Sequence, residues 1–377
     1  MSHVYLILEN GAVFKGRPFG YDGEVVGELV FSTCMTGYLK TLSDPSYYGQ
    51  IVLQTFPLIG NYGVIRRDFG PGPVHLRAYI VRDWCQEPSN FRSEGNLDSF
   101  LREMKTPGLF GVDTRALTRI IRENGTMNAV ISKTAELSEA QWQELRGYRV
   151  TDAVAAVAEL SGKWKNDGGT GDGDADIINT TEPSPCVINT TEPSPCVAPC
   201  VVWDFGGASR LTGGLIACGF APTIVGYDVT ADDIITLNPD GVVLSGGPGD
   251  PAENTKIIDE IKKLCSKKVP ILAVGLGHQM LAIANGAKTG KLPFGHRGAN
   301  QPVKDLASGE ILVTSQNHGY TVLPESLPAT SEVSFVNIND GACEGLEYKD
   351  MPAFSVQFDP EEEIYRRFSE VLRGGNA

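Results

Sequence analysis

Hydrophobic and polar positions in the first 150 residues follow the periods of short strands and of one clear helix. Four β-like runs, punctuated by glycine, are predicted as strands: Val4–Leu8, Ala12–Lys15, Gly27–Ser32 and Gln50–Phe56. Segment 113–124 has apolar residues at helical spacing, with Asp113 as a candidate N-cap and Gly125 just past the end. These patterns predict a mixed α/β domain over residues 1–152.

From about residue 199 the chain alternates between predicted strands and helices. The predicted strands are Val201–Asp204, Pro222–Tyr227, Gly241–Ser245 and Ile271–Val274, and the helices are Leu211–Cys218, Glu253–Lys263 and His278–Asn285. Such alternation is typical of a mostly parallel sheet flanked by helices, with ligand chemistry at the carboxyl ends of the strands. We therefore expect a second α/β domain over residues 199–377.

The composition between these two parts is different. Residues 168–174 are acidic and glycine-rich, and the ten residues Ile178–Val187 recur without change as Ile188–Val197. Two copies are too few for a repeat architecture, in which stacked neighbours supply the core. We interpret 153–198 as a flexible linker with a duplicated segment.

Charge and cysteine content exclude several classes of protein. The net charge is -14, and no stretch has the basic character that a phosphate backbone requires, so nucleic acid is not an expected partner. The sequence has no run of about 18 apolar residues, so we expect no membrane-spanning helix. The first residues lack the features of a signal peptide, and the eight cysteines form no C-x-x-C pair. We expect a reduced, cytoplasmic protein with no metal site.

Three segments at strand ends are candidates for chemistry. Leu244–Pro251 is a glycine-rich loop that lets a backbone approach a ligand closely. Ile271–Gln279 reads as strand, sharp turn and helix, an elbow that exposes one residue at a helix N-terminus. The third segment has two parts, Ser315–Tyr320 and, later in the chain, Ser355–Glu361, which supply further polar side chains.

In this order and spacing, the three segments resemble those of the class I glutamine amidotransferase family. Within that family, the form found in this sequence is similar to the small chain of glutamine-dependent carbamoyl-phosphate synthase. Four more segments carry the same resemblance: Thr41–Tyr47, Ile59–Gly63, Gly111–Arg119 and Phe294–Asn300. Only about residues 155–198 fall outside it.

The resemblance implies an activity and a set of partners. In the family a cysteine at the elbow attacks the side-chain amide of glutamine, a histidine moves the proton and a glutamate orients the histidine. The ammonia then passes to a large synthetase chain, which carries the ATP and magnesium, so no cofactor is expected here. The pathway served, pyrimidine or arginine biosynthesis, stays open. Motif matching assigns glutamine binding to Ser46, Gly247, Gly249, Leu276, Gln279, Asn317, Gly319 and Tyr320.

This sequence departs from the family at two of the three catalytic positions. Gly275 occupies the position of the cysteine and Asp359 that of the histidine, whereas Glu361 is retained. Glycine cannot form an acyl-enzyme, and an aspartate with a pKa near its ordinary value of about 4 is a weak base at neutral pH. We therefore expect negligible glutaminase activity. We also expect Gly275 to relieve backbone strain at the elbow.

Other reactive side chains receive structural interpretations. Cys265 lies about ten residues before the elbow, Cys218 near a predicted helix end and Cys343 in a turn-rich stretch, so we interpret all three as ordinary packed or surface thiols and not as a displaced nucleophile. We favour structural roles for His278, His296 and Arg297, and for His318 over its acting as a replacement base.

Three functions stay open. The first is a chain that holds a large synthetase subunit using free ammonia. The second is a regulator that binds glutamine without turnover. The third is a residual glutaminase with Asp359 as base.

Overall fold

The computed structural model describes residues 3–70, 72–166 and 198–374, and within them the amino-terminal part is a closed β-barrel. Its strands are β1 (Val4–Leu8), β2 (Val13–Gly20), β3 (Val25–Ser32), β4 (Gln50–Gln54), β6 (Ala78–Val81), β8 (Pro107–Phe110) and β9 (Met127–Ser132). They close in the order β1-β2-β8-β6-β4-β3-β9. A short pair, β5 (Leu58–Ile59) and β7 (Asp83–Trp84), lies outside the barrel. All four predicted strands are present.

Five helices accompany the barrel: α1 (Tyr38–Ser43), α2 (Arg66–Phe69), α3 (Leu97–Glu103), α4 (Thr114–Asn124) and α5 (Glu139–Gly147). Helix α4 begins as predicted, because the Asp113 carboxylate accepts the backbone N–H groups of Arg115 and Ala116. Leu117 and Ile121 bury its apolar face in the core shared with the barrel strands. The predicted mixed α/β fold is confirmed.

The carboxyl-terminal part is a nine-stranded sheet in the order β11-β10-β12-β13-β18-β17-β16-β14-β15. Its strands are β10 (Ala198–Trp203), β11 (Phe220–Val225), β12 (Gly241–Leu244), β13 (Ile271–Val274), β14 (Thr289–Asp305), β15 (Ile311–Val322), β16 (Ser331–Asn337), β17 (Cys343–Tyr348) and β18 (Ala353–Val356). The first five strands of the order are parallel and the rest pair antiparallel. In the antiparallel half, Ser315–Tyr320 lies within strand β15 and not at a strand end as predicted, and His296 and Arg297 lie in β14.

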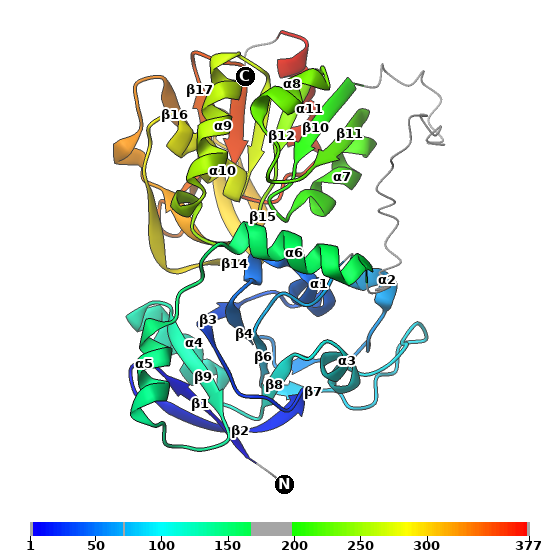
Figure 1. Ribbon diagram of the computed structural model, residues 1–377, viewed down its shortest axis with the longest axis vertical. Coiled ribbons are helices and arrows are strands. Elements are labelled where there is room, and N and C mark those ends of the chain that lie inside the picture. Colours follow the sequence, from blue (N-terminus) through cyan, green and yellow to red (C-terminus); the bar gives the residue numbers. More distant parts are fainter. Residues whose placement is uncertain (1–2, 71, 167–197, 375–377) are drawn as a thin grey trace.

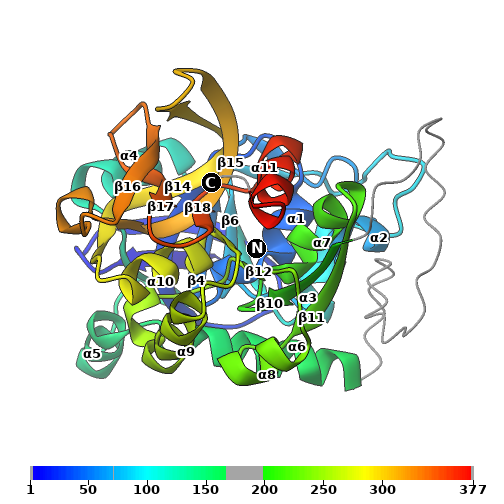
Figure 2. The ribbon, with the colours of Figure 1, turned by 90° about the horizontal axis from the view of Figure 1, so that it is seen from above.

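Helices cover both faces of the parallel half. Those present are α7 (Ala208–Ala217), α8 (Ala231–Thr236), α9 (Thr255–Ser266), α10 (Leu276–Ala284) and α11 (Glu362–Leu372). One core joins α8, α9 and α10 to the sheet, and a second core on the opposite face joins α7 and α11. Figure 2 shows α11 and α7 on one side of β10 and β12, with α9 on the other. The predicted flanked sheet is therefore present.

The prediction of a flexible linker is wrong for residues 153–166. These residues form helix α6 (Ala153–Asn166), in which Val154 and Val157 are buried and Val154 joins the core of the second domain. Figure 1 shows α6 running between the two domains. Val154 and Val157 are three residues apart, so they lie on one face of the helix, and burying that face stabilises α6. A prediction from composition alone overlooks this spacing. The duplicated ten residues lie outside the described residues, and the domain boundaries stay predictions.

The two domains are in direct contact. In strand β14, the Arg297 carbonyl accepts hydrogen bonds from the backbone N–H and the hydroxyl of Thr33, which follows β3. The Lys291 ammonium, also on β14, forms an ion pair with Glu28 on β3. No helix among the described residues is long and apolar enough to cross a bilayer.

Candidate functional site

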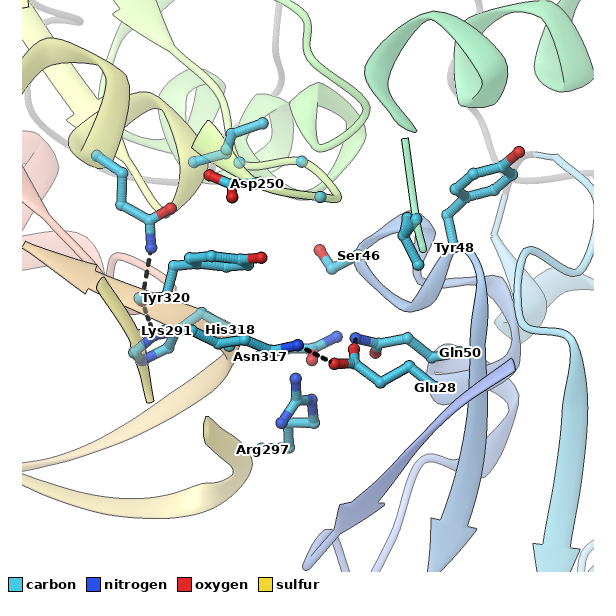
Figure 3. A pocket seen from close by; sticks show the side chains of 18 of the residues that line it. Glu28, Ser46, Tyr48, Gln50, Asp250, Lys291, Arg297, Asn317, His318 and Tyr320 are labelled. Atoms are coloured by element: carbon cyan, nitrogen blue, oxygen red, sulfur yellow. Dashed lines mark hydrogen bonds and ion pairs between the residues drawn. The ribbon is translucent and has the colours of Figure 1, made fainter. Parts of the chain in front are cut away.

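A cavity of about 510 Å³ lies between the two domains, at the carboxyl ends of the parallel strands. It is lined by every predicted glutamine-binding position and by two of the three predicted catalytic positions, Gly275 and Asp359: Ser46, Gly247, Gly249, Gly275, Leu276, Gln279, Asn317, Gly319, Tyr320 and Asp359. In Figure 3, Asn317, Tyr320 and Lys291 face Ser46, Tyr48, Gln50 and Glu28 across it. Residues far apart in sequence thus converge as the motifs predict.

The elbow lies at the floor of this cavity. Strand β13 ends at Val274, and α10 begins at Leu276, with Gly275 between them at φ 55° and ψ -113°. The Gly275 N–H donates to the Val356 carbonyl at 3.0 Å, which holds this conformation. A β-carbon on Gly275 would lie 3.3 Å from Cα of Gly246. The turn therefore has the shape of a nucleophile elbow, and no cysteine is among the residues lining the cavity.

The glycine loop after β12 is packed tightly against its neighbours. A β-carbon on Gly247 would lie 2.3 Å from the Phe205 carbonyl oxygen. Gly249 has φ 89°, and a β-carbon there would lie 2.8 Å from that of Ala153 in α6. Both glycines thus have a packing requirement as well as the close ligand approach that the motif implies.

Two buried amides present acceptor oxygens. Both N–H bonds of the Gln279 amide are engaged, because its nitrogen donates to the Tyr320 carbonyl at 2.7 Å and to Gln357 Oε1 at 2.8 Å. The Asn317 amide nitrogen donates to Asp44 at 2.6 Å, and its Oδ1 is buried with no partner among the described residues. Gln279 therefore offers a ligand only its oxygen, whereas Asn317 offers its oxygen and one remaining N–H.

Tyr320 lies at the other end of the same wall, near Asp250 (Figure 3). Burial raises the pKa of the Tyr320 hydroxyl, and the nearby Asp250 carboxylate raises it further. The phenol is therefore neutral and keeps a proton that it can donate.

Asp359 does not lie free in the cavity. Its Oδ1 is 3.3 Å from Nη2 of Arg210, and Nη1 of the same guanidinium is 2.9 Å from Oδ2 of Asp44. Burial opposes the charge on Arg210, but the two carboxylates outweigh that effect and raise its pKa. Asp44 also accepts a hydrogen bond from Asn317. One network therefore joins Asp44 of the first domain to Asp359 and Asn317 of the second.

Glu361 is not brought into the cavity. It is exposed, it precedes α11, and no hydrogen bond or ion pair joins it to Asp359 among the described residues. Of the three predicted catalytic positions, the structure therefore brings Gly275 and Asp359 to the cavity and leaves Glu361 outside its lining.

Several charged residues of the cavity were missed by sequence reasoning. Glu28, Lys291, Asp44 and Arg210 all lie in or beside it. Burial raises the pKa of Glu28, but Lys291 and the other nearby donors outweigh it and lower the pKa overall. The partners in the pairs Glu28–Lys291 and Asp44–Arg210 are far apart in the sequence, so no short motif indicates that they meet.

The histidines are tied to protein groups. His318 lines the cavity, but Nδ1 lies 2.7 Å from the Tyr320 carbonyl oxygen and Nε2 lies 3.0 Å from Gln316 Oε1. His278 is fully buried, with Nδ1 2.8 Å from Ser355 Oγ, and burial lowers its pKa to about 3. Both positions fit structural roles.

An elbow between a parallel strand and a helix, a glycine loop beside it and convergent amide oxygens define a domain of the glutamine amidotransferase class. The model of class I glutamine amidotransferases matches residues 201–374, and the model of the carbamoyl-phosphate synthase small chain, CPSase domain, matches residues 6–131. The chain belongs to the carbamoyl-phosphate synthase small chain family.

Individual relatives cover nearly the whole chain. The small chain of Clostridium perfringens is 43% identical over 361 residues, 94% of this chain and 93% of that protein. That of Bacillus caldolyticus is 44% identical over 358 residues, 94% of this chain and 90% of that protein. Among solved structures, a glutamine amidotransferase of Thermotoga maritima covers 47% of this chain and 83% of its own, with 18% identity and a TM-score of 0.36.

Proposed function

We propose that this chain holds a large carbamoyl-phosphate synthase subunit that uses free ammonia, while its own glutaminase site is inactive. The observation that carries the proposal is Gly275 at the elbow, where the family resemblance places a nucleophilic cysteine. Without a side chain at that point no thioester with the glutamyl group can form.

The state of Asp359 supports the same conclusion. Its Oδ1 lies 3.3 Å from Nη2 of Arg210. A general base must lie within hydrogen-bond reach of the proton that it removes, and the Asp359 carboxylate is instead engaged with this guanidinium. Loss of the nucleophile removes most of the effect of a catalytic unit, so the loss of the base adds little cost.

The partner follows from the family. Relatives named small chain imply a large chain, and the CPSase-domain model of that family matches residues 6–131 here. ATP and magnesium belong to the large subunit in this proposal, and this chain carries neither.

A second candidate function is that of a regulator that binds glutamine without turnover. The observation that favours it is the lining of the cavity, where all eight predicted glutamine-binding positions converge and two amide oxygens stay available. The third candidate, residual hydrolysis with Asp359 as base, is disfavoured by the ion pair to Arg210.

The test is reconstitution with a large synthetase subunit. We expect a stable complex that forms carbamoyl phosphate from ammonia and ATP and forms none above background from glutamine. No association at micromolar concentration would overturn the scaffold role, and glutamine-dependent synthesis at the rate of an active relative would overturn the inactive site. Calorimetry with glutamine, glutamate and asparagine separates the regulator, because binding heat without glutamate release supports it.

A further inference from the structure

Behind the cavity, the antiparallel strands bring two histidines and a glutamate together. His296 on β14 pairs in register with His318 on β15, and Glu344 follows on β17. One ligand atom from each of the three lies within 4.8 Å of the other two, and all three residues are buried. From the sequence we expected no metal site, and these three residues lie 22 to 48 positions apart in the chain.

In each imidazole, the ring nitrogen that points away from the cluster, here called the outer nitrogen, donates a hydrogen bond. Nδ1 of His318 lies 2.7 Å from the Tyr320 carbonyl oxygen, and Nε2 of His296 lies 2.8 Å from Asp340 Oδ2. A carbonyl or carboxylate oxygen only accepts, so each ring carries a proton on that outer nitrogen. The inner nitrogen of His318, Nε2, then directs a lone pair into the cluster, whereas the inner nitrogen of His296, Nδ1, lies within hydrogen-bond distance of Gln316 Oε1 and Glu344 Oε1 and holds a second proton until a metal ion displaces it.

Most close neighbours of the two inner nitrogens are oxygen atoms, although Asn337 Nδ2 also lies 3.4 Å from His296 Nδ1. Gln316 Oε1 lies 3.0 Å from His318 Nε2 and 3.1 Å from His296 Nδ1, and Glu344 Oε1 lies 3.1 Å from His296 Nδ1. Gln316 keeps its oxygen turned inward, because its amide nitrogen donates to Thr314 Oγ1. A proton on His296 Nδ1 relieves only the contacts of that atom. His318 Nε2 and Gln316 Oε1 are then two hydrogen-bond acceptors in contact with no proton between them, an arrangement that a bound cation would stabilise.

A further buried oxygen lacks a partner. Glu344 is fully buried, Asn337 donates to its Oε1 at 2.9 Å, and its Oε2 has no hydrogen-bond partner among the described residues. A buried carboxylate oxygen without a donor costs free energy, so Oε2 is the atom of Glu344 that a ligand would satisfy.

We propose that His296 Nδ1, His318 Nε2, the Glu344 carboxylate and Gln316 Oε1 bind a divalent transition-metal ion of the zinc type. Imidazole with carboxylate is a donor set that suits zinc, and bonds of about 2.0–2.2 Å place tetrahedral ligands about 3.3–3.5 Å apart. The outer contacts match the usual support of such a site, in which each ligating histidine donates its other N–H to a carboxylate or carbonyl. The ion would join β14, β15 and β17 and fix His318 in the cavity wall.

The experiment uses the full-length chain, stripped with a chelator and then titrated with zinc against a chromophoric competitor. We expect one equivalent per chain in the wild type, affinity at least 100-fold weaker in Glu344→Gln, and unchanged affinity in His3→Gln, which removes a histidine outside the cluster. Failure to bind at micromolar zinc overturns the site, and so does equal affinity in Glu344→Gln.

A second measurement covers the case in which Glu344→Gln fails to fold. Cobalt(II) bound to the wild-type chain should give visible d–d bands without a thiolate charge-transfer band, because no ligand is a cysteine. A sulfur-to-cobalt band would assign the metal to the cysteines and overturn the proposal.

Discussion

Nη2 of Arg210 lies 3.3 Å from Oδ1 of Asp359, and its Nη1 lies 2.9 Å from Oδ2 of Asp44. Asp44 follows α1 of the first domain, whereas Arg210 lies in α7 of the second, so this guanidinium joins the domains beside the elbow. The two carboxylates differ in environment, because the Asp44 side chain is 7% exposed and that of Asp359 is 39% exposed.

This difference predicts unequal effects of removing each partner. Arg210→Met should lower the free energy of unfolding by about 2 kcal/mol, because it leaves the buried Asp44 carboxylate without its cation. Asp359→Asn should cost under about 1 kcal/mol, since water already screens that half of the network. Urea denaturation of both variants checks this, and equal losses would contradict it.

The elbow predicts a cost for restoring its side chain. Gly275→Cys should lower the free energy of unfolding by about 1–3 kcal/mol, because a non-glycine residue is strained at φ 55°. The matched control is Gly213→Ala in α7, where an added β-carbon meets nothing within 4 Å and should be neutral or stabilising by up to about 1 kcal/mol. Thermal melts compare the two, and an unchanged or raised Tm for Gly275→Cys would refute the strain argument.

Catalysis should return only when both reactive groups are restored. Gly275→Cys alone should release no glutamate above background, because the carboxylate at 359 is paired with Arg210. The double variant with Asp359→His should give measurable glutaminase activity. Adding Arg210→Gln should raise it further, since a guanidinium beside the new imidazole disfavours its protonated form. A coupled glutamate assay measures the series, and activity in Gly275→Cys alone would show that Asp359 can act as the base.

His75 predicts a loss of stability in mild acid. It is buried in the first domain, and burial lowers its pKa to about 4, although Asp44 opposes the shift. The unfolded chain binds the proton near pH 6.5 and the folded chain only near pH 4, so stability falls as the pH drops through that window. Between pH 7 and pH 5 this group should cost about 2 kcal/mol.

His75→Gln is the comparison for that prediction. Its free energy of unfolding should fall about 2 kcal/mol less over the same interval, because glutamine does not titrate. Parallel pH profiles for the wild type and the variant would show that His75 does not control this part of the acid response.

Local signals along the chain predicted much of the fold. Asp113 and Gly125 marked the ends of α4, and the four apolar residues Ile271–Val274 are strand β13 as predicted. Caps and buried runs depend on neighbours within a few residues, which is why the sequence reveals them. Helix α6 was missed, because its buried face is defined by the second domain and not by its own composition.

The sequence by itself determined the two domains, the elbow and the absence of a thiol at position 275, since each depends on local pattern or on residue identity. Only the tertiary structure decided that Arg210 neutralises both Asp44 and Asp359, that Glu361 lies outside the cavity lining, and that His296, His318 and Glu344 meet. Such contacts arise from strand register and from the docking of the two domains. Both depend on packing summed over the whole core, so no spacing of these residues along the chain encodes them.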